Sequence, residues 1–278
     1  MSGERLFAEV ATPAELDGLE REHEVDRTPR GLVRAALAEL IALGDRHIVT
    51  VASEPLWSSL EERPLKILDV CAGSGVWASE ARRLFGRLGI PVEITAVELR
   101  IEEREALLRW ADHVVLGDIH ETELLPLDAL GPFDLVIGNP HFTGLHSMLP
   151  ELLGMARAVV LLHTTQAFQR GSVGASLVHA HPPALELRIG QSVRFRHGNN
   201  PANGKPWSAD SLCYSVTAWV GKPPPGSPWL TKGLQLSAHE RRWIEQPGAE
   251  TSGIAELPTA PGWVRPESSG WPSWGDNG

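Results

Sequence analysis

The sequence contains only two cysteines among its 278 residues, Cys71 and Cys213. Two are too few for a disulfide framework or a four-ligand zinc site, so we expect a reducing compartment and no metal. The sequence also lacks any run of about 18 apolar residues, and its first residues, Met-Ser-Gly-Glu-Arg, lack the apolar stretch of a signal peptide. These absences predict a soluble, cytoplasmic protein with no membrane partner.

Positive charge is also in deficit, because 25 Lys and Arg stand against 35 Asp and Glu, for a formal net charge of -10. This balance argues against nucleic-acid binding by the whole surface. Residues 161–232 are an exception with a local net charge of +5, from seven basic and two acidic residues. Within this region Arg194, Arg196 and Lys205 are candidates for phosphate contacts. A solvated strand face is the alternative for the arginines.

Hydrophobic residues make up 42% of the chain, which suits a globular protein with a buried core. Periodicity predicts strands that alternate with helices, and hence an α/β fold with a doubly wound, mostly parallel seven-stranded sheet. The predicted strands are 65–71, 92–98, 113–116, 133–138, 158–163, 184–196 and 212–220, the last two forming an antiparallel pair at the sheet edge. The predicted helices are 28–44, 74–87, 101–110 and 146–156, the first capped by Thr28 and started by Pro29.

Composition divides the chain into three parts. Residues 1–24 are an amino-terminal extension with a short acidic helix predicted at 13–24. Residues 25–222 form the α/β domain. Residues 223–278 are rich in Pro, Gly, Ser and Trp, so we expect an irregular tail there, with a short helix at 238–245.

A glycine-rich turn follows the first predicted strand, in Asp69-Val-Cys-Ala-Gly-Ser-Gly75. Gly73 and Gly75 permit close backbone approach, and the following helix offers unpaired N–H groups to an anionic group. The turn lacks the Gly-Lys-Ser/Thr ending of a phosphate loop and the third glycine of the dinucleotide fingerprint. It predicts a nucleotide-like ligand, and an ordinary strand-to-helix turn is the alternative.

Acidic residues end the next two strands. Glu98 lies about 23 residues beyond Gly75, where an acid commonly binds two ribose hydroxyls, and Asp118 could accept a hydrogen bond from an adenine amino group. Open parallel sheets bind ligands at the carboxyl ends of their strands. The ordered pair behind a glycine turn therefore favours a nucleoside-containing cofactor over two solvated loop acids.

The apolar stretch 133–138 stops abruptly at Asn139-Pro140-His141-Phe142. An exocyclic amine conjugated to an aromatic ring is a poor nucleophile, so a site that methylates it needs acceptors for both N–H groups and an aromatic face to hold the ring. The Asn139 side chain, the Pro140 carbonyl and the Phe142 ring supply these parts.

Together these motifs resemble the class I S-adenosylmethionine-dependent methyltransferases, and within them the phage-type N6-adenine DNA methyltransferases. Asp69–Gly75 resembles the cofactor loop of that family, and Asn139–Phe142 its Asn/Asp-Pro-Pro-Tyr/Phe tetrapeptide. Thr28-Pro29 resembles the amino-terminal segment that contacts the cofactor. The stretch from Arg194 to Trp219 resembles the strand, loop and strand that end phage-type members, so the likeness covers about residues 25–222.

The resemblance implies S-adenosylmethionine as cofactor and adenine in nucleic acid, DNA before RNA, as substrate. Asp69, Gly73 and Gly75 would then shape the pocket for the methionine end, Glu98 would hold the ribose, and Asp118 with Ile119 the adenine of the cofactor. A base in a duplex would have to be flipped out. The implied cofactor-binding residues are Thr28, Asp69, Cys71, Ala72, Gly73, Gly75, Glu98, Asp118, Ile119 and Asn139. The implied catalytic residues are Asn139, Pro140, His141 and Phe142.

Two residues depart from the family pattern. His141 replaces the second proline of the tetrapeptide, which fixes the backbone that aims the preceding carbonyl, and Arg27 replaces an aromatic residue before Thr28. Several interpretations of His141 stay open. The change from proline could relax the loop geometry, alter the choice of substrate or reflect neutral drift, and the histidine could contact the substrate or relay a proton. Two other functions stay open as well: a protein glutamine N-methyltransferase, because a side-chain amide presents a similar conjugated NH₂, and a catalytically inactive cofactor-binding interaction module.

Overall fold

The structure is a computed structural model that describes residues 7–9, 28–44, 50–51, 54–55, 63–120, 127–141, 144–168, 171–195, 212–221, 225–226 and 229–236. All of them belong to the compact unit Met1–Trp243, and the second unit, Ile244–Gly278, lies outside the described ranges. The helices predicted at 13–24 and 238–245 also lie outside the described residues.

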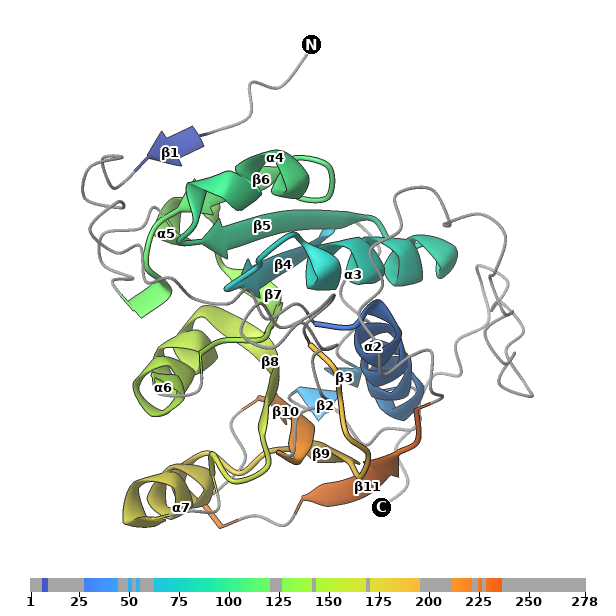
Figure 1. The fold of residues 1–278 in the computed structure, drawn as a ribbon, viewed down its shortest axis with the longest axis vertical. Helices are drawn as coiled ribbons and strands as arrows, with labels where there is room; N and C mark the ends of the chain where they lie inside the picture. Colours follow the sequence, from blue (N-terminus) through green and yellow to red (C-terminus); the bar gives the residue numbers. More distant parts are fainter. Residues whose placement is uncertain are drawn as a thin grey trace, which may run out of the picture. The chain divides into compact units, whose positions relative to one another are not determined.

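The fold is built on a nine-stranded sheet in the order β1-β6-β5-β4-β7-β8-β10-β9-β11 (Figure 1). Only β10 runs antiparallel to its neighbours in this sheet, and the other paired strands are parallel. The strands are β1 Phe7–Glu9, β4 Leu65–Val70, β5 Val92–Glu98, β6 His113–Leu116, β7 Phe133–Gly138, β8 Ala156–Thr164, β9 Leu185–Ile189, β10 Tyr214–Val220 and β11 Leu230–Leu234. A separate two-stranded sheet pairs β2 Thr50–Val51 with β3 Glu54–Pro55.

The predicted fold class, a doubly wound and mostly parallel α/β sheet, is confirmed. The seven predicted strands form the sequence β6-β5-β4-β7-β8-β10-β9, and β1 and β11 add one strand at each end. In this order the last of the seven strands, β10, runs antiparallel between the fifth and the sixth, β8 and β9.

Helices cover both faces of the sheet, which is why the central strand β7 is buried along its whole length (Figure 1). Helices α2 (Arg30–Gly44) and α3 (Val76–Arg87) pack together on one face, and α6 (Leu145–Met155) and α7 (Gly171–Ala180) lie on the other. The remaining helices are short: η1 Ile101–Glu103, α4 Arg104–Leu107 and α5 Leu127–Leu130.

Alternation along the strands assigns side chains to these two faces. In β4, Leu68 and Val70 belong to the hydrophobic core that includes Met148 of α6. Asp69 points the other way, and its carboxylate accepts a hydrogen bond from the first turn of α3. The α2/α3 face and the α6/α7 face therefore have separate interiors.

Several elements differ from the sequence prediction, which gave no strand at β1, β2 or β3 and no helix at α5 or α7. Helix α2 begins at Arg30 rather than at Thr28, and the Pro29 carbonyl accepts the bond from Val33. Strand β9 ends at Ile189 instead of residue 196, because both partner strands end there: Tyr214, the first residue of β10, and Leu234, the last of β11, lie opposite Ile189. Strand β11 lies in the segment expected to be irregular and pairs with β9.

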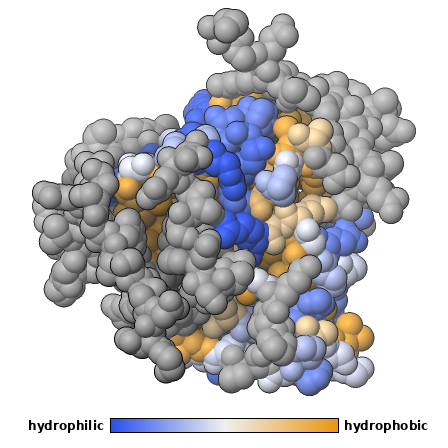
Figure 2. Space-filling model, turned by 180° about the vertical axis from the view of Figure 1, so that it is seen from behind, coloured by the Kyte–Doolittle hydropathy of each residue, from blue (hydrophilic) through white to orange (hydrophobic). Residues whose placement is uncertain are grey.

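The surface seen from behind carries a hydrophilic band with hydrophobic areas beside it (Figure 2). The described part of this face is therefore not one continuous apolar patch. Within the described ranges, no helix has the length and apolar character needed to cross a membrane. The same residues contain no group of three His, Cys, Asp or Glu side chains placed to hold a metal ion.

Candidate active site

The sheet brings three predicted site residues to one edge. Val70, the last residue of β4, pairs with Val97 of β5 and with Gly138, the last residue of β7, so Glu98 ends β5 and Asn139 follows β7 at the same edge. Strand β6 stands in the same register, with Glu98 opposite Leu116, two residues before Asp118. The carboxyl ends of β4, β5, β6 and β7 thus form the common edge at which open α/β sheets bind ligands.

The glycine turn between β4 and α3 has left-handed backbone at three positions, with φ of 52° at Cys71, 53° at Gly73 and 80° at Gly75. Gly75 is the N-cap of α3. A Cβ there would lie 3.3 Å from Trp110 Cδ1. Both the dihedral angle and the packing therefore require glycine at residue 75.

Asp69 is a fully buried carboxylate beneath this turn. Its Oδ2 accepts a hydrogen bond of 2.9 Å from the Ala78 N–H in the first turn of α3. Its Oδ1 is buried and has no hydrogen-bond partner among the described residues. Burial raises the pKa of Asp69 well above its ordinary value, the Ala78 N–H opposes this effect, and the nearby charge of Glu98 adds to it. Oδ1 is therefore suited to accept a hydrogen bond from a ligand, in particular from a positively charged group.

Glu98 connects β5 to the glycine turn. Its Oε2 accepts a hydrogen bond of 2.7 Å from the Gly73 N–H, and its Oε1 accepts bonds of 3.0 Å from both the main-chain N–H and the Nε of Arg100. Arg100 was missed in the sequence. The available signal was a cation two residues after a strand-end acid.

Asp118 and Ile119 follow β6 at the same edge. The Asp118 Oδ1 accepts a hydrogen bond of 2.9 Å from the His120 N–H, and the Asp118 side chain is half-buried. Ile119 is buried in the core. One polar and one apolar residue therefore stand side by side next to Glu98.

Asn139 lies beside Thr28, 111 residues away in the sequence. Its Nδ2 donates a hydrogen bond of 3.2 Å to the Thr28 Oγ1. Its Oδ1 is buried and has no partner among the described residues. This contact places Asn139 on the side of the sheet where α2 begins, which is also the side of Asp69. Each of these two residues has one engaged polar atom and one buried acceptor that the described part of the chain does not use.

Gly138 and Cys71 hold Asn139 close to the glycine turn. A Cβ at Gly138 would lie 2.3 Å from the Val70 carbonyl oxygen, so no other residue fits between β4 and β7 at this point. The His141 backbone N–H forms a hydrogen bond with the Cys71 thiol, whose pKa is raised to about 12, chiefly by burial. Cys71 is thus a protonated thiol at neutral pH and not a nucleophile.

The other predicted site residues are brought together only in part. Pro140 is buried and His141 is exposed. Arg194 is half-buried in the segment that follows β9. Phe142, Arg196 and Lys205 lie outside the described residues, so their predicted roles stay predictions.

No protein-family model matches the chain, and no curated protein matches its sequence. Solved structures do resemble it. The methyltransferase subunit of a type I restriction-modification system from Streptococcus thermophilus has a TM-score of 0.49 at 11% identity, and the match covers 73% of this chain and 45% of that one. A proposed class I S-adenosylmethionine-dependent methyltransferase from Listeria monocytogenes also has a TM-score of 0.49, at 12% identity, with 81% and 72% covered.

A proposed RNA methyltransferase from Pyrococcus horikoshii has a TM-score of 0.40 at 20% identity, and the match covers 64% of this chain and 83% of that one. The chain spans less than half the length of the restriction-modification subunit. Because these three TM-scores are below 0.5, we take neither reaction nor substrate from these structures.

Proposed function

We propose that this chain is an S-adenosylmethionine-dependent methyltransferase that transfers a methyl group to the N6 amine of adenine in nucleic acid, most favourably DNA. The observation that carries the proposal is the Asn139 carboxamide. Its Nδ2 is bonded to Thr28, and its buried Oδ1 has no hydrogen-bond partner among the described residues. A buried acceptor without a partner costs free energy unless a ligand supplies the donor.

The Asn139 Oδ1 accepts one N–H of the target amine in this proposal, and the Pro140 carbonyl accepts the other. These bonds orient the nitrogen lone pair and increase its electron density. Thr28 acts on the substrate through Asn139, because its hydroxyl fixes the amide so that oxygen faces the amine. His141 joins the tetrapeptide to the glycine turn through its backbone N–H. In-line positioning of this kind contributes several kcal/mol to lowering the barrier.

The residues around the glycine turn fit S-adenosylmethionine, which supplies an electrophilic methyl group on a sulfonium when it is bound. Asp69 Oδ1 is a buried acceptor that suits the cofactor's ammonium group, and the turn formed by Cys71, Ala72, Gly73 and Gly75 lies directly above it. Glu98 has lone pairs left for ribose hydroxyls after its bonds to Gly73 and Arg100. Asp118 and Ile119 would hold the adenine, and Thr28 and Asn139 would border the methyl group.

The substrate class rests on fewer contacts. Phe142 would stack on the flipped base, and Arg194, Arg196 and Lys205 would contact phosphate groups. A second candidate is a protein glutamine amide, because the unpaired Oδ1 of Asn139 fits any conjugated NH₂ group. The aromatic face of Phe142 distinguishes the two, since only the base offers a ring for stacking.

The test is incubation of the full chain with methyl-labelled S-adenosylmethionine and unmodified DNA, followed by nucleoside analysis. N6-methyladenine is the expected product. Parallel reactions with RNA and with glutamine-containing protein assign the alternatives. Cofactor binding without transfer to any of the three would overturn the catalytic proposal and favour an interaction module.

A further inference from the structure

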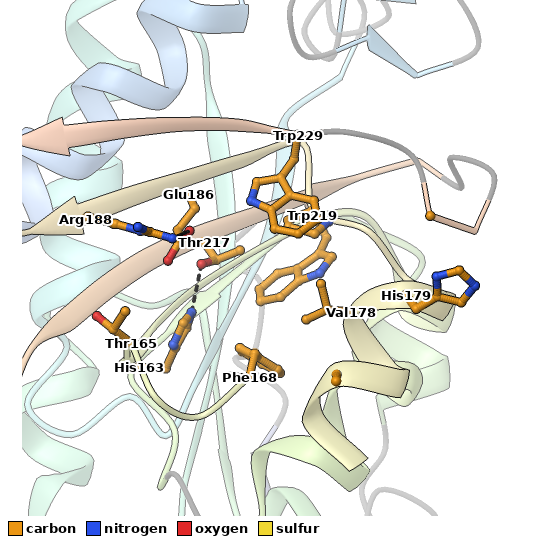
Figure 3. A pocket seen from close by; sticks show the side chains of 13 residues that line it. His163, Thr165, Phe168, Val178, His179, Glu186, Arg188, Thr217, Trp219 and Trp229 are labelled. Atoms are coloured by element: carbon orange, nitrogen blue, oxygen red, sulfur yellow. Dashed lines mark hydrogen bonds and ion pairs between the residues drawn. The ribbon is translucent and has the colours of Figure 1, made fainter. Parts of the chain in front are cut away.

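A cavity of about 490 Å³ lies between α7 and the strands β8, β9 and β10 (Figure 3). Its volume is within the range of small-ligand sites. Figure 3 shows Trp229 above Trp219 on one side, Glu186 and Arg188 on another, and His163 with Phe168 below. The cavity therefore combines aromatic walls with a polar floor.

This cavity and Asn139 lie on opposite faces of the sheet. His163 is on β8 at the same parity as Val159 and Leu161, which belong to the core under α6, and Trp219 and Phe168 belong to the same core. The Asn139 side chain reaches Thr28 at the start of α2, on the other face. The cavity is thus not the space in which the proposed amine or cofactor would bind.

One part of the polar floor is a chain of hydroxyl groups that ends at Glu186. The Ser215 Oγ donates to the Glu186 Oε1 at 3.1 Å, so Thr165, 3.1 Å from Ser215, must be the donor to it. Glu186 is buried, and its Oε2 accepts a bond of 3.0 Å from Arg188. Each carboxylate oxygen still has a lone pair for a ligand.

The other part of the floor is His163 with Thr217. His163 Nδ1 lies 2.8 Å from the Thr164 carbonyl, which can only accept, so Nε2 is the acceptor for the Thr217 hydroxyl at 2.8 Å. Burial lowers the pKa of His163 to about 4, so this neutral tautomer persists at neutral pH. The hydroxyl protons of Thr165, Ser215 and Thr217 are all engaged, so the donors that this polar surface leaves to a ligand are those of the Arg188 guanidinium, which gives one bond to Glu186.

The aromatic walls of the cavity determine the shape of a ligand that fits. The Trp219 indole N–H is engaged with the His181 carbonyl at 3.0 Å, and the Trp219 ring is only 1% exposed, so the accessible aromatic face of the cavity is that of Trp229. Trp229 is 42% exposed, although Trp219 below it is buried. Aromatic faces favour stacking with a planar ring. A flat ligand that brings N–H donors for Glu186 and an acceptor for Arg188 fits these groups.

We propose that this cavity binds an amino-substituted heteroaromatic ring of nucleoside size, stacked on Trp229 and donating its amine hydrogens to Glu186. The ring can come from a free nucleoside or from a nucleotide in a strand. The site does not depend on the proposed methyl transfer, because none of its residues touches Asn139 or the glycine turn in the structure.

Calorimetric titration of the full chain with adenosine tests the site. Saturable binding is expected, and Trp229→Ala and Glu186→Gln should each weaken it about tenfold or more. Trp229 is exposed, so its variant should fold even if Glu186→Gln does not. Leu230→Ala is the matched control, because Leu230 is also exposed and pairs with Leu185, whose side chain points to the opposite face from Glu186. Its affinity should equal that of the wild type.

Purine riboside, which lacks the exocyclic amine, should bind about tenfold more weakly than adenosine. Competition by a single-stranded oligodeoxyadenylate would identify a nucleotide in a strand as the source, and its absence a free nucleoside; both results support the site. No adenosine binding, or binding that survives both Trp229→Ala and Glu186→Gln, would overturn it. Binding lost only in Glu98→Ala would also overturn it, because adenosine would then occupy the proposed cofactor site.

Discussion

Two buried aspartates at opposite edges of the sheet show how differently the protein treats a carboxylate. Asp134, at the amino end of β7, accepts two bonds of 2.7 Å from Arg63 and one of 2.9 Å from the Lys66 N–H, with Arg157 at 3.8 Å. Asp69, at the carboxyl end of β4, accepts one bond and keeps Oδ1 buried without a described partner. A carboxylate saturated by the chain serves the fold, whereas an unsaturated one is available to a ligand.

Asn139 lies at the same edge as Asp69 and also keeps an acceptor without a described hydrogen-bond partner. Its replacement tests the contrast most strongly. Asn139→Ala should reduce methyl transfer about 10²-fold or more, a loss comparable with removal of one polar group that binds a transition state. Cofactor affinity should stay unchanged, because Oδ1 serves the substrate amine. Single-turnover rates and calorimetry measure the two quantities.

Thr28→Val is the companion variant, because it keeps the shape but removes the partner of the Asn139 Nδ2. Its rate should fall about tenfold, which corresponds to the loss of one hydrogen bond of about 1.4 kcal/mol. Full turnover in Asn139→Ala would refute the assignment of the tetrapeptide.

Asp134→Ala should damage stability instead of function. The variant loses the Arg63 fork and the acceptor for the Lys66 N–H, but Arg63 is half-exposed and can be rehydrated. We expect a decrease of about 2–3 kcal/mol in the free energy of unfolding, measured by urea denaturation. Activity per folded molecule should match the wild type, and a selective loss of activity would contradict the division between the two edges.

Glu98→Ala should weaken S-adenosylmethionine binding about tenfold, or about 1.4 kcal/mol, through loss of the ribose acceptor and of the bond that holds Gly73. Calorimetry measures the change. Glu102→Ala is the matched control, since Glu102 is an exposed acid four residues further on. Equal affinity of the two variants would remove Glu98 from the ribose-binding role.

Asp69→Asn should have the smallest effect on the fold. The folded-state pKa of Asp69 is raised, so its contribution to stability is fully present below the ordinary aspartate pKa of about 3.9 and is lost as pH rises through the raised value. The amide cannot ionise, so the melting temperature of the variant at neutral pH should equal or exceed that of the wild type by a few degrees.

Cofactor affinity should depend on pH in the opposite direction to the stability contribution of Asp69. Binding to the wild type should tighten as pH rises through the raised pKa, because the carboxylate and not the acid attracts an ammonium group. Asp69→Asn should lack this pH dependence and bind more weakly. Melting curves and titrations from below the ordinary aspartate pKa upward would show both trends. A stability loss near that of Asp134→Ala would contradict the contrast between the two aspartates.

Much of this contrast could be anticipated from the sequence, because parallel strands bring their carboxyl ends together whatever their side chains. Alternating apolar segments therefore sufficed to predict the edge shared by Asp69, Glu98 and Asn139. Pairings between distant residues could not be predicted. The bonds Thr28–Asn139 and Arg63–Asp134 depend on three-dimensional approach, and no local pattern encodes them.

The polar cavity beneath α7 was missed for a similar reason. Its acceptors come from three strands, and period-two patterning identifies which residues share a face but not which strands are neighbours. Strand β11 was missed because Pro, Gly and Trp around it indicate irregular structure, whereas pairing with the exposed edge of β9 stabilises it.

The antiparallel direction of β10 has a consequence for how the protein can vary. β9 ends at Ile189 and β10 begins at Tyr214, and these residues are paired with each other, so the intervening connection leaves and re-enters the sheet at the edge that carries Asn139. Insertions or exchanges within this connection would leave the register of β9 and β10 unchanged. Under the proposed function, this connection is the natural position at which evolution, or an engineer, could change target selectivity while the strands stay the same.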